Sequence, residues 1–127
     1  MAIQRLSTRA VTVLRNPGKL SEQWVWPHNA PESAMTITRV AMQPGAVSSR
    51  HNHARAEQIW IIERGEGALL LAGGETAALA AGDIVRTPAG DIHGVENTGR
   101  EPLVYLAITT PPEDFTARYS DVVPGTV

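Results

Sequence analysis

Turn residues divide this chain into short segments, and this feature constrains the fold most strongly. The chain has 127 residues, among them 11 glycines and 9 prolines, which are spread along it at fairly regular intervals. The runs between them are mostly rich in β-branched and aromatic residues and too short for stable helices. These runs are Val11–Leu14, Met35–Met42, Ile59–Ile62, Ala68–Ala72, Asp83–Arg86 and Leu103–Thr109. We therefore predict an all-β fold, a sandwich or a small barrel.

Two segments are candidates for helices instead. Glu75–Ala81 is rich in alanine but ends at Gly82, and Glu113–Tyr119 follows a pair of prolines. Neither segment is long enough to form a stable helix without tertiary support. The chain shows no internal repeat and no linker, so we predict one domain over residues 1–127.

Composition excludes several classes of protein. The absence of cysteine rules out disulfides, thiol nucleophiles and cysteine-ligated metals. Lys and Arg total 11 against 13 for Asp and Glu, with no basic run, so we expect no nucleic-acid partner. The most apolar stretch, Ala68–Ala72, is far below the roughly 18 residues of a membrane-spanning helix. With no membrane segment or targeting signal expected, the default prediction is a cytoplasmic protein.

The histidines are the strongest candidates for chemistry. His51 and His53 are one residue apart, so on a strand both imidazoles project from one face and can converge on a metal ion. Gln58 or its neighbour Glu57 is a further candidate ligand, but strand alternation lets only one of them point inward. His93 lies 40 residues beyond His53 and must be brought close by the fold. The alternatives are that His51 and His53 are exposed strand residues, that Gln58 is an amide at the rim of the pocket, and that His93 is a buried, hydrogen-bonded imidazole.

These residues resemble the two sequence motifs of the cupins, small jelly-roll barrels built as a double-stranded β-helix and including the RmlC-like proteins. The first motif reads here Gly45, His51, His53, Gln58 and Gly65. The second is matched in full by Gly82, Pro88, Gly90, His93 and Asn97. The resemblance covers a barrel at about residues 35–110, flanked by N-terminal strands in residues 1–34 and a C-terminal tail in residues 111–127. We read the motif glycines as positions that need a positive φ or a close approach of the backbone.

The resemblance implies one divalent metal ion bound by His51, His53, Gln58 and His93. Nitrogen and oxygen donors without thiolate suit Fe, Mn, Zn, Ni and Co about equally. Gln58 stands where the family usually has a glutamate, and Glu57 fits only if the spacing to the next glycine is stretched by one residue. A neutral glutamine leaves the charge of the metal uncompensated by protein ligands, which favours an anionic, chelating substrate.

Other residues are candidates for the pocket. Trp60 and Ile62 have the same strand parity as Gln58 and are expected to form an apolar wall of a substrate pocket. Tyr105 is a candidate catalytic acid or hydrogen-bond donor, and otherwise a core residue. Arg39 is a candidate for holding a substrate carboxylate, and otherwise lies on a solvated face. His28 matches no motif position, so we expect it at the surface or in packing.

The resemblance implies a metal-dependent enzyme acting on a small oxygenated metabolite, by dioxygenase-type or isomerase/cyclase-type chemistry. The alternative is a cupin that binds or senses a sugar or another metabolite without turnover. Similar cupins form homodimers through flanking strands, here Val11–Leu14 and Trp24–Val25, although such strands can equally cover their own barrel. In either case we expect the determinants of function to lie in the walls of the barrel pocket.

Overall fold

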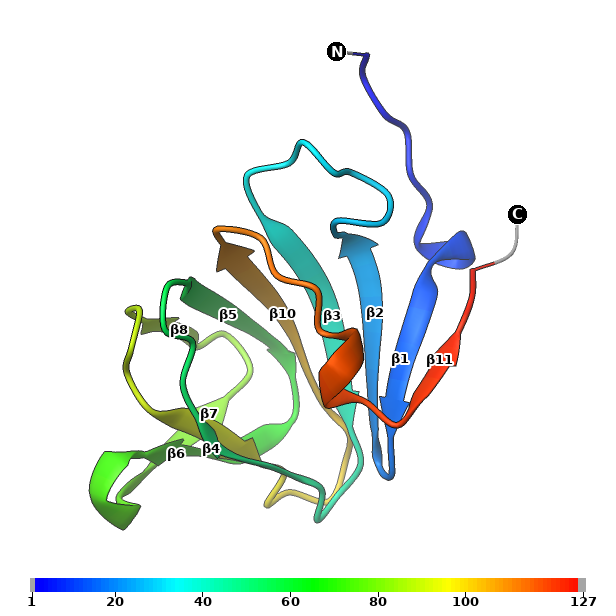
Figure 1. The fold of residues 1–127 in the computed structure, drawn as a ribbon. Helices are drawn as coiled ribbons and strands as arrows, with labels where there is room; N and C mark the ends of the chain where they lie inside the picture. Colours follow the sequence, from blue (N-terminus) through cyan, green and yellow to red (C-terminus); the bar gives the residue numbers. More distant parts are fainter. Residues whose placement is uncertain (1, 126–127) are drawn as a thin grey trace.

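The computed structural model describes residues 2–125 and confirms the all-β, jelly-roll fold (Figure 1). In this range, every strand pairing is antiparallel and the strands form two sheets. The larger sheet has the order β11-β1-β2-β3-β10-β5-β8, and the smaller one β4-β9-β6-β7. No helix in the same range is long and apolar enough to span a membrane.

The strands are short, as the spacing of the turn residues predicts, and each of the six predicted runs overlaps one of them. The larger sheet contains β1 (Thr12–Asn16), β2 (Lys19–Val25), β3 (Thr36–Met42), β5 (Glu57–Arg64), β8 (Ile84–Thr87), β10 (Leu103–Thr110) and β11 (Asp121–Val123). The smaller sheet contains β4 (Val47–His51), β6 (Glu66–Leu71), β7 (Thr76–Ala80) and β9 (His93–Glu96). Three single-turn 3₁₀ helices lie between strands or before them: η1 (Thr8–Ala10), η2 (Ala72–Gly74) and η3 (Thr116–Arg118).

The hydrophobic core lies between the two sheets. Strand β3 alternates buried and half-buried residues along its whole length, as expected of a strand with one face on the core. The core cluster draws on both sheets and consists of Val40, Met42, Trp60, Ile62, Leu79, Val95, Leu103, Tyr105 and Ala107. This packing holds the strands that carry the candidate metal ligands.

Neither helical alternative is correct. Glu75–Ala81 contains strand β7, which pairs with β6 along its whole length and turns Leu79 into the core. This pairing provides backbone hydrogen bonds that the alanine-rich segment could not make as an isolated short helix, so tertiary context overrides its helix propensity. In Glu113–Tyr119 only the three residues of η3 are helical, with 3₁₀ geometry.

The N-terminal strands extend the larger sheet of their own chain. Leu14 on β1 is fully buried. The chain turns from β1 to β2 through Pro17 and Gly18, and the positive φ of Gly18 after a proline is typical of a type II turn. The apolar N-terminal segment thus covers its own core, and the homodimer stays a prediction.

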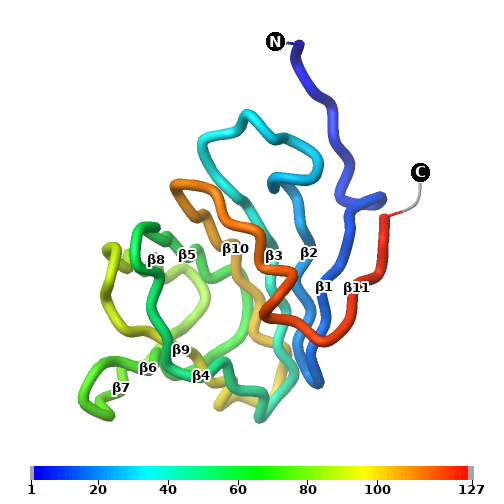
Figure 2. The backbone as a smooth tube through the Cα atoms, in the orientation of Figure 1, coloured from blue at the N-terminus to red at the C-terminus, as the bar shows by residue number. Residues whose placement is uncertain are grey.

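The C-terminal segment crosses from the middle of the larger sheet to its edge. Figure 2 shows the backbone leaving β10, passing through the orange segment and ending in the red strand β11 beside β1. On this path the ring of Phe115 comes within 6.0 Å of the ring of His53, measured between centroids. Residues after position 110 therefore form part of the surroundings of the histidines.

The motif glycines Gly45, Gly65, Gly82 and Gly90 all have positive φ angles, as predicted. Gly65 is the most constrained, because a Cβ there would lie 2.5 Å from the carbonyl oxygen of Pro102. At Gly73 φ is also positive, but a Cβ would meet nothing within 4 Å.

We expect Gly65→Ala to lower the free energy of unfolding by about 3 kcal/mol and Gly73→Ala by about 1 kcal/mol, since only the first adds a steric clash to the strain of a positive φ. Urea unfolding of both variants measures the difference. Equal losses would show that the close approach at Gly65 is relieved without cost.

Candidate metal centre

The sheet register brings the two histidine motifs together. His51 on β4 lies opposite His93 on β9, and their ring centroids are 4.5 Å apart. Strand β4 ends at His51, so His53 is presented by the loop that follows rather than by strand alternation. The carbonyl of His53 accepts a hydrogen bond of 2.8 Å from the backbone N–H of Gly90, which ties this loop to the turn before His93.

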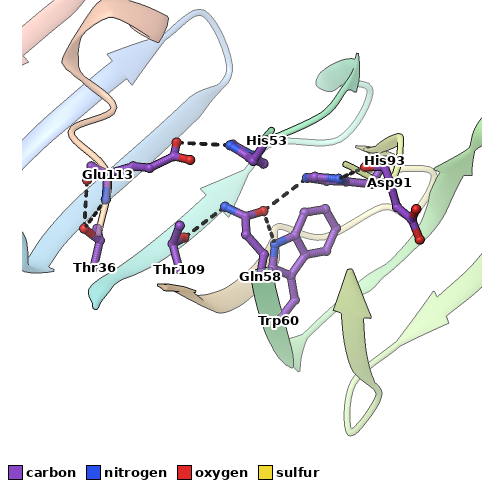
Figure 3. Close-up of polar contacts among 8 residues, drawn as sticks. All are labelled: Thr36, His53, Gln58, Trp60, Asp91, His93, Thr109 and Glu113. Carbon is purple, nitrogen blue, oxygen red and sulfur yellow. Dashed lines mark hydrogen bonds and ion pairs between the residues drawn. The ribbon is translucent and has the colours of Figure 1, made fainter. Parts of the chain in front are cut away.

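In each of the three imidazoles, Nδ1 faces an oxygen acceptor. These contacts are His51 Nδ1 to the Ser49 carbonyl (2.7 Å), His53 Nδ1 to the Glu113 carboxylate (3.0 Å) and His93 Nδ1 to the Asp91 carbonyl (3.2 Å). Figure 3 shows the last two. Because these oxygens only accept, they favour the proton on Nδ1 and leave a lone pair on Nε2, as in histidines that bind metals. One ligand atom from each of the three rings lies within 4.8 Å of the others.

The Nε2 atoms show why this site suits a cation. Nε2 of His53 is buried and has no hydrogen-bond partner among the residues that the structure describes. Nε2 of His93 lies 3.1 Å from Oε1 of Gln58. A neutral His93 can donate to Asp91 or to Gln58 but not to both, whereas a cation at Nε2 and Oε1 satisfies both lone pairs. The donor set therefore fits a divalent metal ion.

Gln58 on β5 is oriented by two further hydrogen bonds. Its side-chain Nε2 donates to Oγ1 of Thr109 (3.0 Å), and its Oε1 accepts from Nε1 of Trp60 (3.3 Å), so the amide oxygen faces His93 (Figure 3). The side chain is buried. Glu57 pairs instead with Arg86, at 3.0 Å, in an exposed ion pair. Of the two alternative ligands, the structure therefore places Gln58 beside the histidines.

The electrostatic environment keeps the imidazoles neutral. Burial lowers the pKa of His51, His53 and His93, and the positive charge of Arg118 acts in the same direction on each. Neutral imidazole is the form that binds a metal, because a proton competes for the same lone pair. Burial raises the pKa of Tyr105 well above its usual range, so its hydroxyl stays protonated. Tyr105 can therefore donate a hydrogen bond but cannot serve as a base at neutral pH.

A cavity of about 320 Å³ opens beside this cluster. Among the predicted site residues, its lining includes His51, His53, Gln58, Trp60 and Tyr105. The rings of Trp60 and Tyr105 pack against each other, with centroids 4.8 Å apart, and form an apolar part of the wall.

Two predicted pocket residues do not line this cavity. Ile62 is buried in the core cluster and is absent from the lining. Arg39 lies on the opposite face of β3, where its guanidinium meets the carboxylates of Glu63 (3.3 Å) and Glu22 (3.7 Å). The assignment of Arg39 to the pocket is therefore corrected, because the side chains of β3 that face inward belong to the residues of the other parity.

His28 lies at the surface, as predicted. Its Nε2 is 2.6 Å from the carboxylate of Asp114, and its ring centroid is 4.4 Å from that of Trp26. Asn97 stabilises a turn, since its Oδ1 accepts from the N–H of Gly99. In addition its amide donates to the carbonyl of Met42, which anchors the turn to β3.

Residues outside the predicted barrel complete the site. The C-terminal segment contributes Phe115, Arg118 and Tyr119 to the lining, β2 contributes Lys19, and Glu113 holds His53. The walls of the pocket therefore include residues from outside the barrel predicted at about residues 35–110. No motif or periodicity marks these residues, because they reach the site only through the path of the tail across the sheet.

Glu113 is held in place for its contact with His53. The hydroxyl of Thr36 donates to the backbone carbonyl of Glu113 (2.8 Å) and accepts from its N–H (3.0 Å). We expect Glu113→Ala to weaken metal binding about ten- to a hundredfold, the usual effect of removing the acceptor behind a ligating histidine. A competition titration against a chelator measures it. Asp114→Ala, which removes the neighbouring carboxylate from the surface histidine His28, is the matched control, and an equal loss there would contradict a specific role for Glu113.

The structure thus defines a small jelly-roll protein with a histidine cluster and a pocket between its sheets. A family model described as a cupin domain matches residues 38–109, more than half of the chain. The chain belongs to the cupin family.

Relatives of known sequence include proteins named for carboxylic acids. The chain is 33% identical over 75 residues to the oxalate-binding protein of Thermotoga maritima, an alignment that covers 59% of this chain and 61% of the relative. It is 32% identical over 100 residues to the gentisate 1,2-dioxygenase of a Ralstonia species, covering 79% of this chain and 26% of that enzyme. The chain thus spans about three fifths of the first relative and a quarter of the second.

Solved structures show the same fold. A predicted oxalate decarboxylase from Thermotoga maritima superposes with a TM-score of 0.71 at 25% sequence identity. The superposition covers 85% of this chain and 99% of that structure. The superposition therefore extends beyond the residues that the family model matches.

Proposed function

We propose that this cupin binds one divalent metal ion and acts on a small oxygenated organic acid that chelates it. The observation that carries the proposal is the set of three imidazoles anchored through Nδ1, with the buried, unpartnered Nε2 of His53 among them. His51, His53, His93 and Gln58 would hold the metal. Their donor atoms are compatible with Fe, Mn, Zn, Ni or Co.

The metal supplies Lewis acidity toward a keto, enol or hydroxy-acid group and, as ferrous iron, reactivity with dioxygen. The chain supplies the surroundings. Trp60 and Phe115 give the pocket apolar walls that exclude water, which strengthens electrostatic contacts inside it. Tyr105, protonated at neutral pH, is the candidate donor to a substrate oxygen.

The names of the relatives support an acid as the ligand. The oxalate-binding protein and the predicted oxalate decarboxylase are named for a dicarboxylic acid, and gentisate is an aromatic hydroxy-acid. A carboxylate suits this site because all four proposed ligands are neutral, so the bound metal keeps its full positive charge.

Binding without turnover is the second candidate function. It is favoured by the pocket lining formed by residues 2–125, which contains no carboxylate and, apart from the proposed metal ligands, no group that could act as a general base at neutral pH. Tyr105 is held in its protonated form. A relative named for binding alone is consistent with this candidate.

Metal analysis and turnover assays test these proposals in sequence. Elemental analysis of protein purified without a histidine tag should find about one transition metal per chain, and a substoichiometric content would contradict the metal site. Oxygen consumption and substrate loss are then followed over catechols, β-diketones, keto-acids and uronates. Turnover supports the enzyme, whereas saturable binding of an acid without turnover, with the metal present and reduced, supports the binding protein.

We also propose that the protein is a homodimer, as in similar cupins. The expected result is a mass of twice the 13.6 kDa of the chain by light scattering at micromolar concentration. A monomer under these conditions would contradict the proposal.

A further inference from the structure

Among residues 2–125, two basic side chains line the pocket beside the histidine cluster, and no acidic side chain does. Apart from the histidines, the charged residues of the lining are Lys19 and Arg118. The nearby carboxylate of Glu113 is engaged with Nδ1 of His53 and is not part of the lining. The pocket therefore carries positive charge even before a metal binds.

Lys19 is fixed in position but keeps unused donors. It follows the Pro17–Gly18 turn at the start of β2. Its Nζ donates to Oγ of Ser48 at 2.5 Å and lies 5.2 Å from the centroid of the Tyr119 ring. An ammonium group has three N–H donors, so two remain for a ligand.

Arg118 is anchored through its backbone while its guanidinium stays free. Its N–H donates to the carbonyl of Phe115 (2.9 Å), and its carbonyl accepts from the side-chain amide of Asn16 (3.0 Å). Within residues 2–125, the arginines that pair with carboxylates are Arg15, Arg39, Arg64 and Arg86. Arg118 makes no such pair there. An arginine that lines a pocket and has no internal ion-pair partner there is suited to bidentate binding of an anion.

We propose that Lys19 and Arg118 form an anion subsite that binds a second acidic group of the ligand. The ligand is then a dianion, in which a 2-oxo or 2-hydroxy acid group at one end chelates the metal. This inference rests on the proposed function, since it takes the metal to bind the other end. Both residues lie outside the family match at residues 38–109, so the subsite is built by the flanks of this chain.

An anion subsite at Lys19 and Arg118 predicts a ligand other than oxalate. Chelation occupies both carboxylates of oxalate and leaves no anionic group for Lys19 or Arg118. A cavity of about 320 Å³ is at the lower end of the range for small-molecule sites and accommodates a longer acid. The expected class is a 2-oxo or 2-hydroxy acid with a carboxylate or phosphate at its far end.

Binding of matched acids to the zinc-loaded protein tests the subsite. Zinc is chosen because it has no redox chemistry, so the acids are not oxidised or reduced by the metal. By calorimetry, 2-oxoglutarate should bind about ten- to a hundredfold more tightly than 2-oxopentanoate, which has the same chain without the second carboxylate. Arg118→Gln and Lys19→Gln should each lose much of this preference, and the double variant nearly all of it. Including 3-phosphoglycerate shows whether a phosphate or a carboxylate is bound better.

Arg100→Gln is the matched control, because Arg100 is exposed, lies outside the lining and carries the same charge. It should keep the preference for the dianion. Equal affinity for the two oxo-acids in the unchanged protein, or a preference that survives in the double variant, would overturn the subsite. Failure of the proposed function looks different, since then neither acid would show binding that depends on the metal.

Discussion

Replacing both His51 and His93 by alanine is expected to abolish stoichiometric metal binding. The two residues face each other across β4 and β9 and supply two of the three imidazoles of the cluster. If the free energy of metal binding is shared among four ligands, each contributes about 3 kcal/mol. Loss of two ligands then weakens binding about ten-thousandfold. Elemental analysis of untagged protein and competition with a chelator measure the change.

His28→Ala is the control of the same residue type, because His28 is exposed and pairs with Asp114 away from the cluster. It should keep the metal content of the unchanged protein. Thermal unfolding of the metal-free proteins separates loss of a ligand from loss of the fold, since His93 is buried. A folded double variant with unchanged metal content would contradict the assigned site.

The fold could be predicted from the sequence because turns and strand alternation are local patterns, whereas the grouping of His93 with His51 and His53 was implied by the resemblance to the cupin motifs. Glycines and prolines end the strands, and the motif glycines take the positive φ angles predicted for them. The spacing between Gln58 and Gly65 fixes the parity of β5, and strand alternation then separates Gln58 from Glu57. A change of one residue in that spacing would have exchanged the two side chains.

Other features depend on contacts that leave no local pattern. Arg39 was misplaced because the inward face of β3 begins with Thr36 and Thr38, whose polarity hides the phase of the strand. Glu113 reaches His53, and Arg118 reaches the pocket, only because the tail crosses from β10 to β11. A contact between residues 60 positions apart, as between His53 and Glu113, carries no periodicity along the chain.

Gln58 is where this chain departs from the usual cupin motif, and its charge state gives the second large prediction. Gln58→Ala removes the amide oxygen that faces His93 and leaves the indole N–H of Trp60 without its acceptor. We expect metal binding to weaken by about a hundredfold or more, as for the loss of one of four ligands. Gln58→Glu should instead strengthen metal binding by about tenfold or more, because it adds a negative charge next to the cation. Chelator competition on both variants measures the two shifts.

The same Gln58→Glu substitution should weaken the binding of an anionic chelating acid to the loaded protein, because the carboxylate neutralises charge that the ligand would otherwise meet. Opposite changes for metal and acid would identify the neutral amide as a determinant of ligand charge, which a purely structural role for Gln58 does not predict. Glu57→Ala, which removes the exposed partner of Arg86, should change neither affinity. If Glu57→Ala weakened metal binding while Gln58→Ala did not, the ligand would be the other residue, and β5 would have to sit one residue out of the register seen here.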